Sequence, residues 1–309
     1  MIIGHEKVLS YLDVLLRARE GGRNILLLGP QGIGKRLLAT MYAQALLCEN
    51  NNLLKNLACT CGSCQAYLHN IHPDSMVVDC AVAGGVADMR ILKETLSRTP
   101  LRGRRVVIFD NAEAMTLEAG NALLKTLEEP RSDTAFLMIV HRDTIPVTVR
   151  SRFEIIRMGL VSQEALLDSR GDISPEDAEL LKYLSGGRPG TLMALRENTR
   201  ALERARSYSA HLVTFLRGSI YQRMRYFDTV KEEDRREEFA HWPHMLMDYL
   251  SSTAGVPQFF PRRYHNDLQF AAFPSVLLLK ALRGLLHIEE LKHRYNLNTS
   301  LLEEQLTLI

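Results

Sequence analysis

The segment Gly29–Arg36 (Gly-Pro-Gln-Gly-Ile-Gly-Lys-Arg) constrains the fold of this 309-residue chain more than any other stretch. It follows the apolar run Ile25–Leu28 and precedes an apolar, helix-forming segment that begins at Leu37. The spacing G-x-x-x-x-G-K between a strand and a helix is typical of a phosphate-binding loop, because the glycines let backbone N–H groups converge on an oxyanion. We therefore expect an α/β fold with a parallel sheet. An ordinary glycine turn is the alternative, and the strand and helix on either side argue against it.

Position 36 departs from the usual pattern of such loops. The residue after the lysine is normally Ser or Thr, whose hydroxyl ligates the magnesium of a bound triphosphate, whereas Arg36 cannot bind a metal cation. Two cations at a helix N-terminus also oppose the helix dipole, by ~0.3–1 kcal/mol each, unless an anion binds there. The loop is therefore expected to hold phosphate and to be poorly equipped to hydrolyse it.

A second departure follows the apolar run Val106–Asp110, which predicts a strand in the buried centre of a parallel sheet. Asp110 ends this strand on the edge where α/β folds bind ligands. In ATPases of this kind a Glu usually follows that Asp and polarises the attacking water, but here Asn111 follows, and an amide is no general base. Glu113 would need an unusual turn to substitute. The candidate nucleotide-binding residues are Gly29, Pro30, Gln31, Gly32, Ile33, Gly34, Lys35, Arg36 and Asp110.

Four of the five cysteines lie in a polar insertion at about residues 48–66. They are Cys48, Cys59, Cys61 and Cys64, spaced C-x10-C-x-C-x2-C. Four thiols this close are the ligand set of a structural zinc, which would also supply the folding energy of a short insertion. The alternatives are a mobile loop with free cysteines, or a site in which His69 or His72 replaces one thiol. Cys80, at the end of the predicted strand Ser75–Asp79, is expected to be a core residue.

Composition and charge exclude some classes of protein. A hydrophobic content of 46% with 24% charged residues is ordinary for a globular protein, and 309 residues suffice for two or three domains. The net charge of +2 does not by itself indicate nucleic-acid binding. The start Met1–Glu6 lacks the basic residues and apolar core of a signal peptide. We therefore expect a cytoplasmic protein that does not contact a membrane.

Further elements follow from hydrophobic periodicity. Helices are predicted at His5–Arg19 and Val86–Arg98, and a strand at Ala135–Val140. A third helix, Leu117–Glu129, is expected to be capped by Thr116, to bury Leu117, Leu124 and Leu127, and to stop at Pro130. Its last turn carries Glu128 and Glu129, where the helix dipole prefers cations, so these acids either pair with basic groups on a neighbouring element or chain or form a solvated acidic end.

The run Asn121–Pro130 (Asn-Ala-Leu-Leu-Lys-Thr-Leu-Glu-Glu-Pro), followed by Ser151 and Arg152, resembles the core signature of bacterial clamp-loader AAA+ subunits, the γ/τ and δ′ subunits of DNA polymerase III. The resemblance is strong over residues 1–195 and weak beyond. In that family the motif Ser-Arg-Cys carries an arginine finger that reaches the ATP of the adjacent subunit. Arg152 matches the finger, with Phe153 in place of Cys. An ordinary surface arginine is the alternative.

The resemblance also implies a domain organisation: an AAA+ core at 1–158 with a zinc-binding insertion, a helical lid at 159–200 and an all-α collar at 201–309, through which subunits associate. Active relatives place a phosphate-sensing arginine near the start of a lid helix. Arg188 is close, but Pro189 fills that position. In the collar, five arginines scattered among acids predict a solvated helix face; they are Arg217, Arg223, Arg225, Arg235 and Arg236.

Taken together, these features favour a δ′-type subunit that does not hydrolyse ATP alone but donates Arg152 to the ATP of a neighbour. The resemblance implies γ/τ and δ subunits as partners, and through the complex the sliding clamp and primer-template DNA. Structural Zn²⁺ is expected, with ATP or ADP at a site whose Mg²⁺ position is degenerate. Two alternatives remain: an active γ-like ATPase, supported by Lys35 and Asp110, and a zinc-containing nucleic-acid-binding protein with a vestigial AAA+ core.

Overall fold

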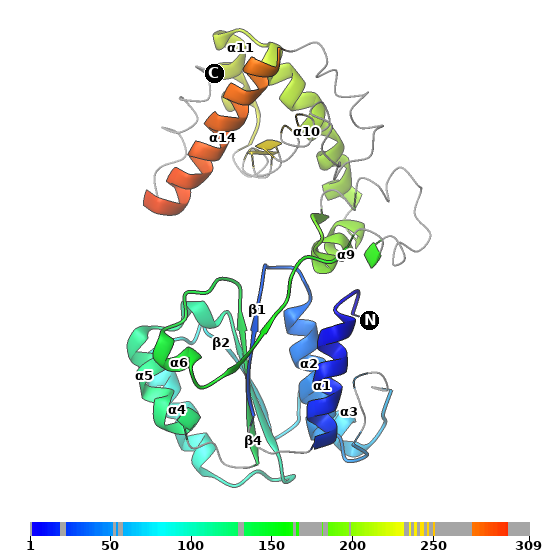
Figure 1. Cartoon of the computed structure of the whole chain (residues 1–309), viewed down its shortest axis with the longest axis vertical. Coiled ribbons are helices and arrows are strands. Elements are labelled where there is room, and N and C mark those ends of the chain that lie inside the picture. Colours follow the sequence, from blue (N-terminus) through cyan, green and yellow to red (C-terminus); the bar gives the residue numbers. More distant parts are fainter. Residues whose placement is uncertain are drawn as a thin grey trace. The chain divides into compact units, whose positions relative to one another are not determined.

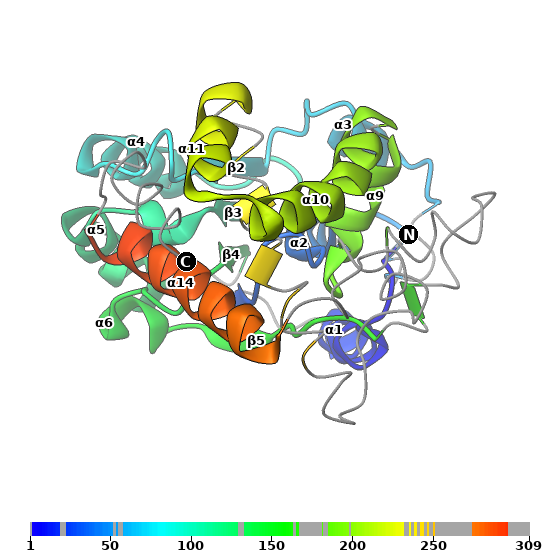
Figure 2. The same ribbon diagram turned by 90° about the horizontal axis from the view of Figure 1, so that it is seen from above.

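The chain folds into two compact units, which Figure 1 shows; Figure 2 shows the same ribbon seen from above. The first unit comprises Met1–Gly171 and Gly186–Thr191, and the second comprises Asp172–Ser185 and Leu192–Ile309. The computed structural model describes residues 2–18, 23–51, 54, 58–128, 133–162, 165–166, 181, 185–197, 199–231, 235, 238–239, 242–243, 246, 250 and 274–295.

The first unit is built on a sheet of five parallel strands in the order β2-β3-β4-β1-β5. The strands are β1 (Asn24–Leu28), β2 (Ser75–Asp79), β3 (Arg105–Asp110), β4 (Thr134–Val140) and β5 (Glu154–Arg157). All six residues of β3 are buried, because helices cover both of its faces and β2 and β4 flank it. The predicted α/β class with a parallel sheet is thereby confirmed.

Helices cover both faces of this sheet (Figure 1). On one face lie α1 (Glu6–Ala18), α2 (Lys35–Leu47) and α3 (Gly62–Leu68); on the other lie α4 (Val86–Ser97), α5 (Leu117–Glu128) and α6 (Val147–Arg150). Successive side chains of β3 point to opposite faces of the sheet, as in any strand, and therefore pack into two different cores. Val106 and Ile108 belong to the core beneath α1 and α2, and Val107 and Phe109 to the core beneath α4 and α5.

Helix α5 begins where the sequence predicts but is rotated from its expected orientation. The Thr116 side-chain oxygen accepts a hydrogen bond from the Ala119 N–H at 3.2 Å, which confirms the predicted cap. Leu127 is buried as predicted, and Leu124 is partly buried against the same core. Leu117, expected on the buried face, is 57% exposed, whereas Leu123 is fully buried. The buried stripe is therefore formed by residues 119, 123 and 127, four residues apart. Glu129 and Pro130 lie outside the described residues.

The described part of the second unit is helical and contains an aromatic core. Its helices include most of α9 (Pro189–Glu197) together with α10 (Thr199–Arg217), α11 (Ile220–Thr229) and α14 (Ser275–Tyr295). The fully buried Trp242 lies among the rings of Phe215, Phe239 and Tyr226, with ring centroids 5.0–5.7 Å away. No helix in the described part of the chain combines the length and apolar content needed to span a membrane.

Two of the five arginines predicted on a solvated helix face, Arg223 and Arg235, instead bind helix ends. Arg217 and Arg225 are exposed as predicted, and Arg236 lies outside the described residues. Arg223 donates from Nε to the Phe215 carbonyl at 3.0 Å and from Nη2 to the Leu216 carbonyl at 3.1 Å. Arg235 donates from Nη1 to the Val230 carbonyl at 2.6 Å. These carbonyls lie at the ends of α10 and α11, where backbone acceptors lack partners within the helix and the dipole favours cations. Charge counting along the sequence does not reveal such a contact.

Candidate functional site

The glycine loop lies between β1 and α2, where the sequence places it. Gly34 adopts a left-handed backbone with φ of 96°, and α2 begins at Lys35. Gly29 must be a glycine, because a Cβ atom there would lie 2.1 Å from the Met158 carbonyl oxygen. Pro30 and Gln31 are exposed at the tip of the loop, whereas Ile33 is buried beneath it.

Lys35 folds back onto the loop that it follows. Its Nζ donates to the carbonyl oxygens of Gly29 at 2.5 Å and Pro30 at 2.7 Å, and the residue is only 3% exposed. Burial lowers the pKa of Lys35 to about 8, although the nearby carboxylates of Glu113 and Asp110 act in the opposite direction. A bound phosphate would add a further negative charge and favour the protonated lysine.

Arg36 forms an ion pair with the buried Asp110. The distance from Arg36 Nη1 to Asp110 Oδ2 is 3.0 Å; the aspartate side chain is 6% exposed and the arginine side chain 72%. In loops of this kind, the residue after the lysine and an aspartate at the end of another strand of the sheet hold Mg²⁺ between them. Here the guanidinium supplies the positive charge that the aspartate would otherwise take from a metal. The Arg36–Asp110 pair is thus internal to the chain.

Asn111 and His141 extend this polar group across three strand ends. Asn111 Nδ2 donates to Asp79 Oδ1 at 2.9 Å, and Asn111 Oδ1 lies 3.2 Å from His141 Nε2. Burial and then the charge of Lys35 lower the pKa of His141, so the neutral imidazole is favoured and its Nε2–H donates to the amide oxygen. Sequence reasoning missed His141; its place after a buried strand is the signal that could have found it.

Glu113 reaches the site through the unusual turn that the sequence analysis required. Asn111 adopts a left-handed backbone with φ of 49°, and residues Ala112–Ala114 form a single 3₁₀ turn. The Glu113 carboxylate then accepts hydrogen bonds from the His141 backbone N–H at 3.2 and 3.3 Å. A carboxylate therefore stands at the site, although not at the position directly after Asp110.

The beginning of α9 packs against the glycine loop. The Gly190 N–H donates to the Gly32 carbonyl at 2.7 Å, and a Cβ atom on Gly190 would lie 2.8 Å from that oxygen. Pro189, the first residue of α9, is buried, and Arg188 precedes it. The close backbone approach at Gly32 explains why a glycine stands at position 190.

Arg152 lies just beyond α6 and is bound within its own chain. Its Nη2 forms an ion pair with Glu128, and its Nη1 donates to the Thr148 carbonyl and to Ser151 Oγ, the latter at 3.2 Å. The arginine side chain is 25% exposed and the glutamate side chain 50%. Glu128 therefore has a partner on a neighbouring element, which was one of the two predicted alternatives for it. The guanidinium remains partly accessible.

The four cysteines of the insertion converge in space. The Sγ atoms of Cys48, Cys59, Cys61 and Cys64 all lie within 4.8 Å of one another. A tetrahedral zinc with Zn–S bonds of about 2.3 Å sets its sulfurs about 3.8 Å apart, so this donor set fits the metal. Burial opposes ionisation of Cys61, but hydrogen bonds from the backbone at Cys64 and Glu49 outweigh it and lower the pKa of the thiol to about 6. That favours the thiolate of Cys61, which is the form that binds metal, whereas burial raises the pKa of Cys64 in the same cluster.

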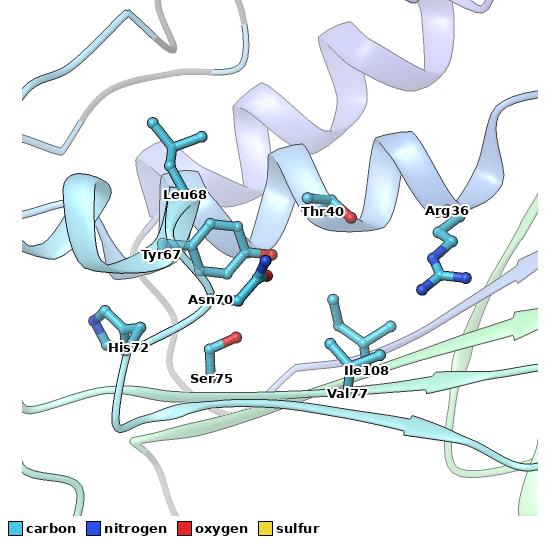
Figure 3. Close-up of a pocket in the computed structure, with 9 residues that line it drawn as sticks. All are labelled: Arg36, Thr40, Tyr67, Leu68, Asn70, His72, Ser75, Val77 and Ile108. Atoms are coloured by element: carbon cyan, nitrogen blue, oxygen red, sulfur yellow. The ribbon is translucent and has the colours of Figure 1, made fainter. Parts of the chain in front are cut away.

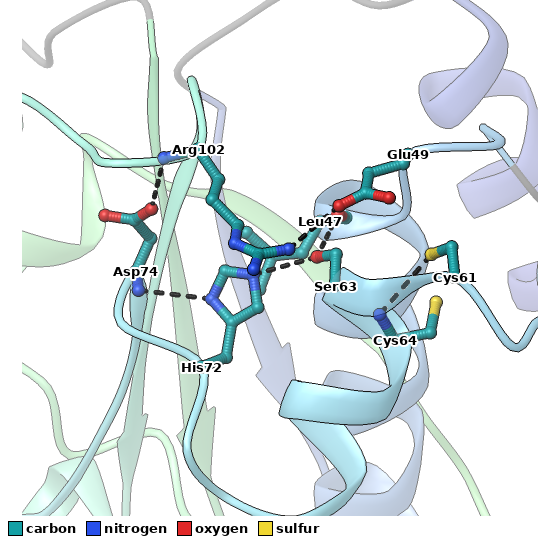
Figure 4. Close-up of polar contacts among 8 residues, drawn as sticks. All are labelled: Leu47, Glu49, Cys61, Ser63, Cys64, His72, Asp74 and Arg102. Atoms are coloured by element: carbon teal, nitrogen blue, oxygen red, sulfur yellow. Dashed lines mark hydrogen bonds and ion pairs between the residues drawn. The ribbon is translucent and has the colours of Figure 1, made fainter.

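His72 lies beside this cluster but has other partners (Figure 4). Its Nδ1 accepts a hydrogen bond from the Asp74 N–H at 3.1 Å, and its Nε2 lies 2.8 Å from Ser63 Oγ. The Ser63 hydroxyl in turn donates to the Leu47 carbonyl at 2.6 Å. With both ring nitrogens engaged, His72 does not replace a thiol. Cys80 is 2% exposed in the core, as predicted.

A cavity of about 380 Å³ opens beside Arg36, between α2, α3 and the edge strand β2 (Figure 3). Hydroxyl and aliphatic groups line it: Thr40, Tyr67 and Ser75 contribute the former, and Val77 and Ile108 are among the latter. Arg36 is the one candidate nucleotide-binding residue among those that line this cavity. The cavity therefore adjoins the candidate phosphate site at Arg36 without including Lys35.

Curated proteins resemble a little over half of this chain. DNA polymerase III subunit delta′ of Pseudomonas aeruginosa is 39% identical over 180 residues, which cover 55% of this chain and 54% of that protein. DNA polymerase III subunit gamma of Buchnera aphidicola (subsp. Schizaphis graminum) is 30% identical over 188 residues, 58% of this chain and 50% of that protein. The chain thus spans about half the length of these curated relatives.

A solved structure is similar over a longer stretch. The DNA polymerase III gamma subunit-related protein of Thermotoga maritima has a TM-score of 0.48 and 17% identity, with 96% of this chain and 97% of that chain covered. The family described as "DNA polymerase III, delta subunit" has a model that matches residues 4–161. Since this match covers half of the chain, including the glycine loop, the cysteine cluster and Arg152, the chain belongs to the DNA polymerase III delta subunit family.

Proposed function

We propose that the chain is a δ′-type AAA+ subunit of the DNA polymerase III clamp loader that hydrolyses no ATP itself. In this proposal it donates Arg152 in trans to ATP bound by a neighbouring subunit and so supports ATP-dependent loading of the sliding clamp onto primed DNA. The observation that carries the proposal is the ion pair between Arg36 and Asp110 at 3.0 Å.

The Arg36–Asp110 pair argues against a metal at this site. The chain offers no hydroxyl next to Lys35, and Asp110 is already neutralised by a guanidinium. These residues do not fit Mg²⁺, because a hard cation needs oxygen ligands in an octahedral arrangement. Lys35 and the backbone N–H groups of the loop still suit a phosphate. We infer that any bound ATP or ADP is held without Mg²⁺ and is not turned over.

Asn111 also argues against hydrolysis. An amide has no basic lone pair to accept a proton from water, and this amide is bound on both sides, to Asp79 and to His141. The residue that normally follows the strand aspartate and orients the attacking water is therefore missing. The group that could still take part in ATP hydrolysis is the guanidinium of Arg152, whose side chain is 25% exposed. A guanidinium supplied in trans stabilises the charge of phosphoryl transfer and is worth ~10³-fold or more in turnover.

The proposal also includes the partners of the chain and a bound metal. Relatives of the chain are named gamma, tau and delta′ subunits of DNA polymerase III, which supports γ/τ and δ subunits as its partners. The sliding clamp and primer-template DNA would then be reached through the assembly. For the cysteine cluster we propose a structural Zn²⁺ held by Cys48, Cys59, Cys61 and Cys64, because their sulfurs fit a tetrahedral site.

ATP turnover by the purified chain tests the absence of hydrolysis. We expect no more than background release of phosphate with Mg²⁺ and ATP, and no difference between wild type and Lys35→Ala. Turnover that Lys35→Ala abolishes would contradict the proposal.

An active γ-like ATPase is the second candidate, and one observation favours it. The 3₁₀ turn brings the Glu113 carboxylate to the site, where its charge acts on Lys35. If Glu113 served as the general base, Glu113→Gln would abolish turnover by the purified chain. We favour the first candidate, because the Glu113 carboxylate already accepts the His141 N–H and Arg36 holds the place of the metal.

A further inference from the structure

Asn24, the first residue of β1, joins the two segments that carry Glu128 and Arg152. Its Nδ2 donates to the Leu127 carbonyl in the last turn of α5 and to the backbone carbonyl of Arg152 itself, each at 3.0 Å. Leu127 directly precedes Glu128. One amide group therefore fixes the spacing between the backbone that carries the acid and the backbone that carries the arginine.

The orientation of the Asn24 amide follows from its partners. Both are carbonyl oxygens, which only accept hydrogen bonds, so the NH₂ group must face them. Asn24 Oδ1 is buried and has no partner among the described residues. A buried acceptor without a partner is unfavourable. The two hydrogen bonds that Nδ2 donates offset this cost, which explains why an asparagine is suited to this position.

The guanidinium of Arg152 is held by acceptors of its own chain. Glu128 binds Nη2, and the Thr148 carbonyl and Ser151 Oγ bind Nη1, whereas Nε is buried without a partner among the described residues. In this position the positive charge is already neutralised. An arginine finger that reaches a neighbouring triphosphate must first exchange this carboxylate for a phosphate.

Such an exchange is feasible because Glu128 is half exposed. A solvent-exposed ion pair is weak, since water screens both charges, and a phosphate oxygen offers the guanidinium the same hydrogen-bonding geometry with more charge. The backbone of Arg152 need not move, because Asn24 holds its carbonyl independently of the side chain. Only the side chain has to change partner.

This inference rests on the proposed function: we propose that Glu128 pairs with the Arg152 guanidinium until a neighbouring nucleotide replaces it. Asn24 is the positioning residue that fixes the spacing between the two backbone segments. A triphosphate on the adjacent subunit takes the guanidinium by replacing one anion with another. Glu128 thus competes with the neighbouring nucleotide for the finger and prevents the charge from binding other anions before assembly. Neither residue touches the nucleotide through its own side chain.

The Glu128 part is tested by ATP turnover of the reconstituted clamp loader containing full-length Glu128→Gln. We expect turnover at limiting concentrations of this subunit to rise about 1.5- to 5-fold, the range of an exposed ion pair, and the gain to shrink at high salt. Asp143→Asn is the matched control, because it removes the carboxylate that pairs with Arg150 at 2.8 Å on the same segment. Unchanged or reduced turnover with Glu128→Gln overturns the competition.

The Asn24 part needs a readout that a purely structural role would not change. Asn24→Ala should lower kcat of the complex about tenfold and leave KM for ATP within about twofold, because the nucleotide is bound by the neighbour and only the finger is misplaced. Asn24→Ser, which retains one donor, should lose less. A fall in melting temperature with kcat unchanged overturns the positioning role. If Asn24→Ala does not fold, the proposal is still tested by Glu128→Gln, which changes an exposed side chain.

Arg152→Ala separates this inference from the function on which it rests. If Arg152→Ala leaves turnover of the complex unchanged, the finger itself is refuted. If Arg152→Ala lowers turnover but Glu128→Gln does not raise it, the role of Arg152 as a finger is supported and the competition by Glu128 is refuted.

Discussion

At the scale of single residues, the guanidinium of Arg36 decides what the glycine loop can bind. It satisfies the charge of Asp110 from within the chain, with the carboxylate almost fully buried. Breaking such a pair leaves an uncompensated buried charge, which is strongly unfavourable. A metal ion at this place would have to displace the arginine before it could reach the aspartate. In the proposed function, the loop therefore binds an anion through its backbone and holds no metal.

Arg36→Ser supplies the missing hydroxyl and frees Asp110. For the wild type we expect ADP affinity to be the same within about twofold in Mg²⁺ and in EDTA, whereas Arg36→Ser should bind ADP more tightly with Mg²⁺. Titration calorimetry measures both, and Arg36→Met is the control that removes the ion pair without adding a hydroxyl. A wild-type affinity for ADP that is tenfold or more higher in Mg²⁺ than in EDTA would contradict this account.

Lys35 gives the first unit a defined response to alkaline pH. Burial lowers its folded-state pKa from 10.5 to about 8, so between these values the unfolded chain binds more protons and the free energy of unfolding rises with pH. Relative to Lys35→Met, which does not titrate, the wild type should gain about 2–3 kcal/mol between pH 7.5 and 10.5. Phosphate affinity should fall over the same window as the lysine loses its charge. Urea titrations of both proteins at the two pH values provide the measurement. An equal change in the free energy of unfolding of the two proteins between these pH values would refute the prediction.

At the scale of elements, helix ends are completed by distant side chains. Arg223 binds the last carbonyls of α10, and the ring of Phe215 lies 5.6 Å from its guanidinium carbon. Arg235 does the same at the end of α11, with its guanidinium carbon 5.8 Å from the ring of Phe227. Charge, hydrogen bonding and ring contact therefore act together at each end.

Arg223→Met should destabilise the second unit by about 1–2 kcal/mol, because it leaves two helix carbonyls without their donor. The fluorescence of Trp242, the single tryptophan of the chain and fully buried in this unit, reports its unfolding directly. Arg225→Met, at an exposed position on the same helix, is the control and should change stability by less than about 0.5 kcal/mol. Equal effects of the two substitutions would contradict the role of Arg223.

The cysteine cluster holds a short insertion that has little core of its own. Protein purified without chelator should contain about one zinc per chain, and Cys64→Ser should lose most of it. Cys80→Ser is the control, because Cys80 belongs to the core and lies outside the cluster. Elemental analysis decides the point: wild-type protein without metal, or Cys64→Ser with a full equivalent, would contradict a four-cysteine site.

Much of the sheet could be predicted because buried parallel strands are continuous apolar runs. β2 has the predicted bounds, and β3 differs by one residue. The buried faces of helices were harder to predict: Leu117 was expected on the buried face of its helix but is 57% exposed, because periodicity does not fix the rotation of a helix on its sheet.

The motif residues of the site could also be found from the sequence, but their partners could not. Arg36 and Asp110 are 74 positions apart, and Asn24 meets Arg152 across 128. Such contacts depend on strand order, and nothing in local composition encodes the order β2-β3-β4-β1-β5. The sequence indicated that Arg36 was incompatible with a metal, whereas the structure shows which acid it neutralises.

At the scale of the whole molecule, the proposed function places the nucleotide chemistry at the boundary between this chain and a neighbour. In that proposal the chain's own loop binds phosphate without a metal or a general base, and Arg152 acts on the nucleotide of another subunit. An assembly built this way needs the chain for turnover without using its nucleotide site. The two sites should therefore respond in opposite ways to substitution.

ATP turnover of the reconstituted clamp loader, measured with Lys35→Ala and with Arg152→Ala in this chain, compares the two sites in one assay. We predict that Lys35→Ala leaves turnover within about twofold of wild type, whereas Arg152→Ala lowers turnover at the adjacent nucleotide site by ~10³-fold, the effect of removing an arginine supplied in trans. The reverse result, with Lys35→Ala inactive and Arg152→Ala unaffected, would contradict the account.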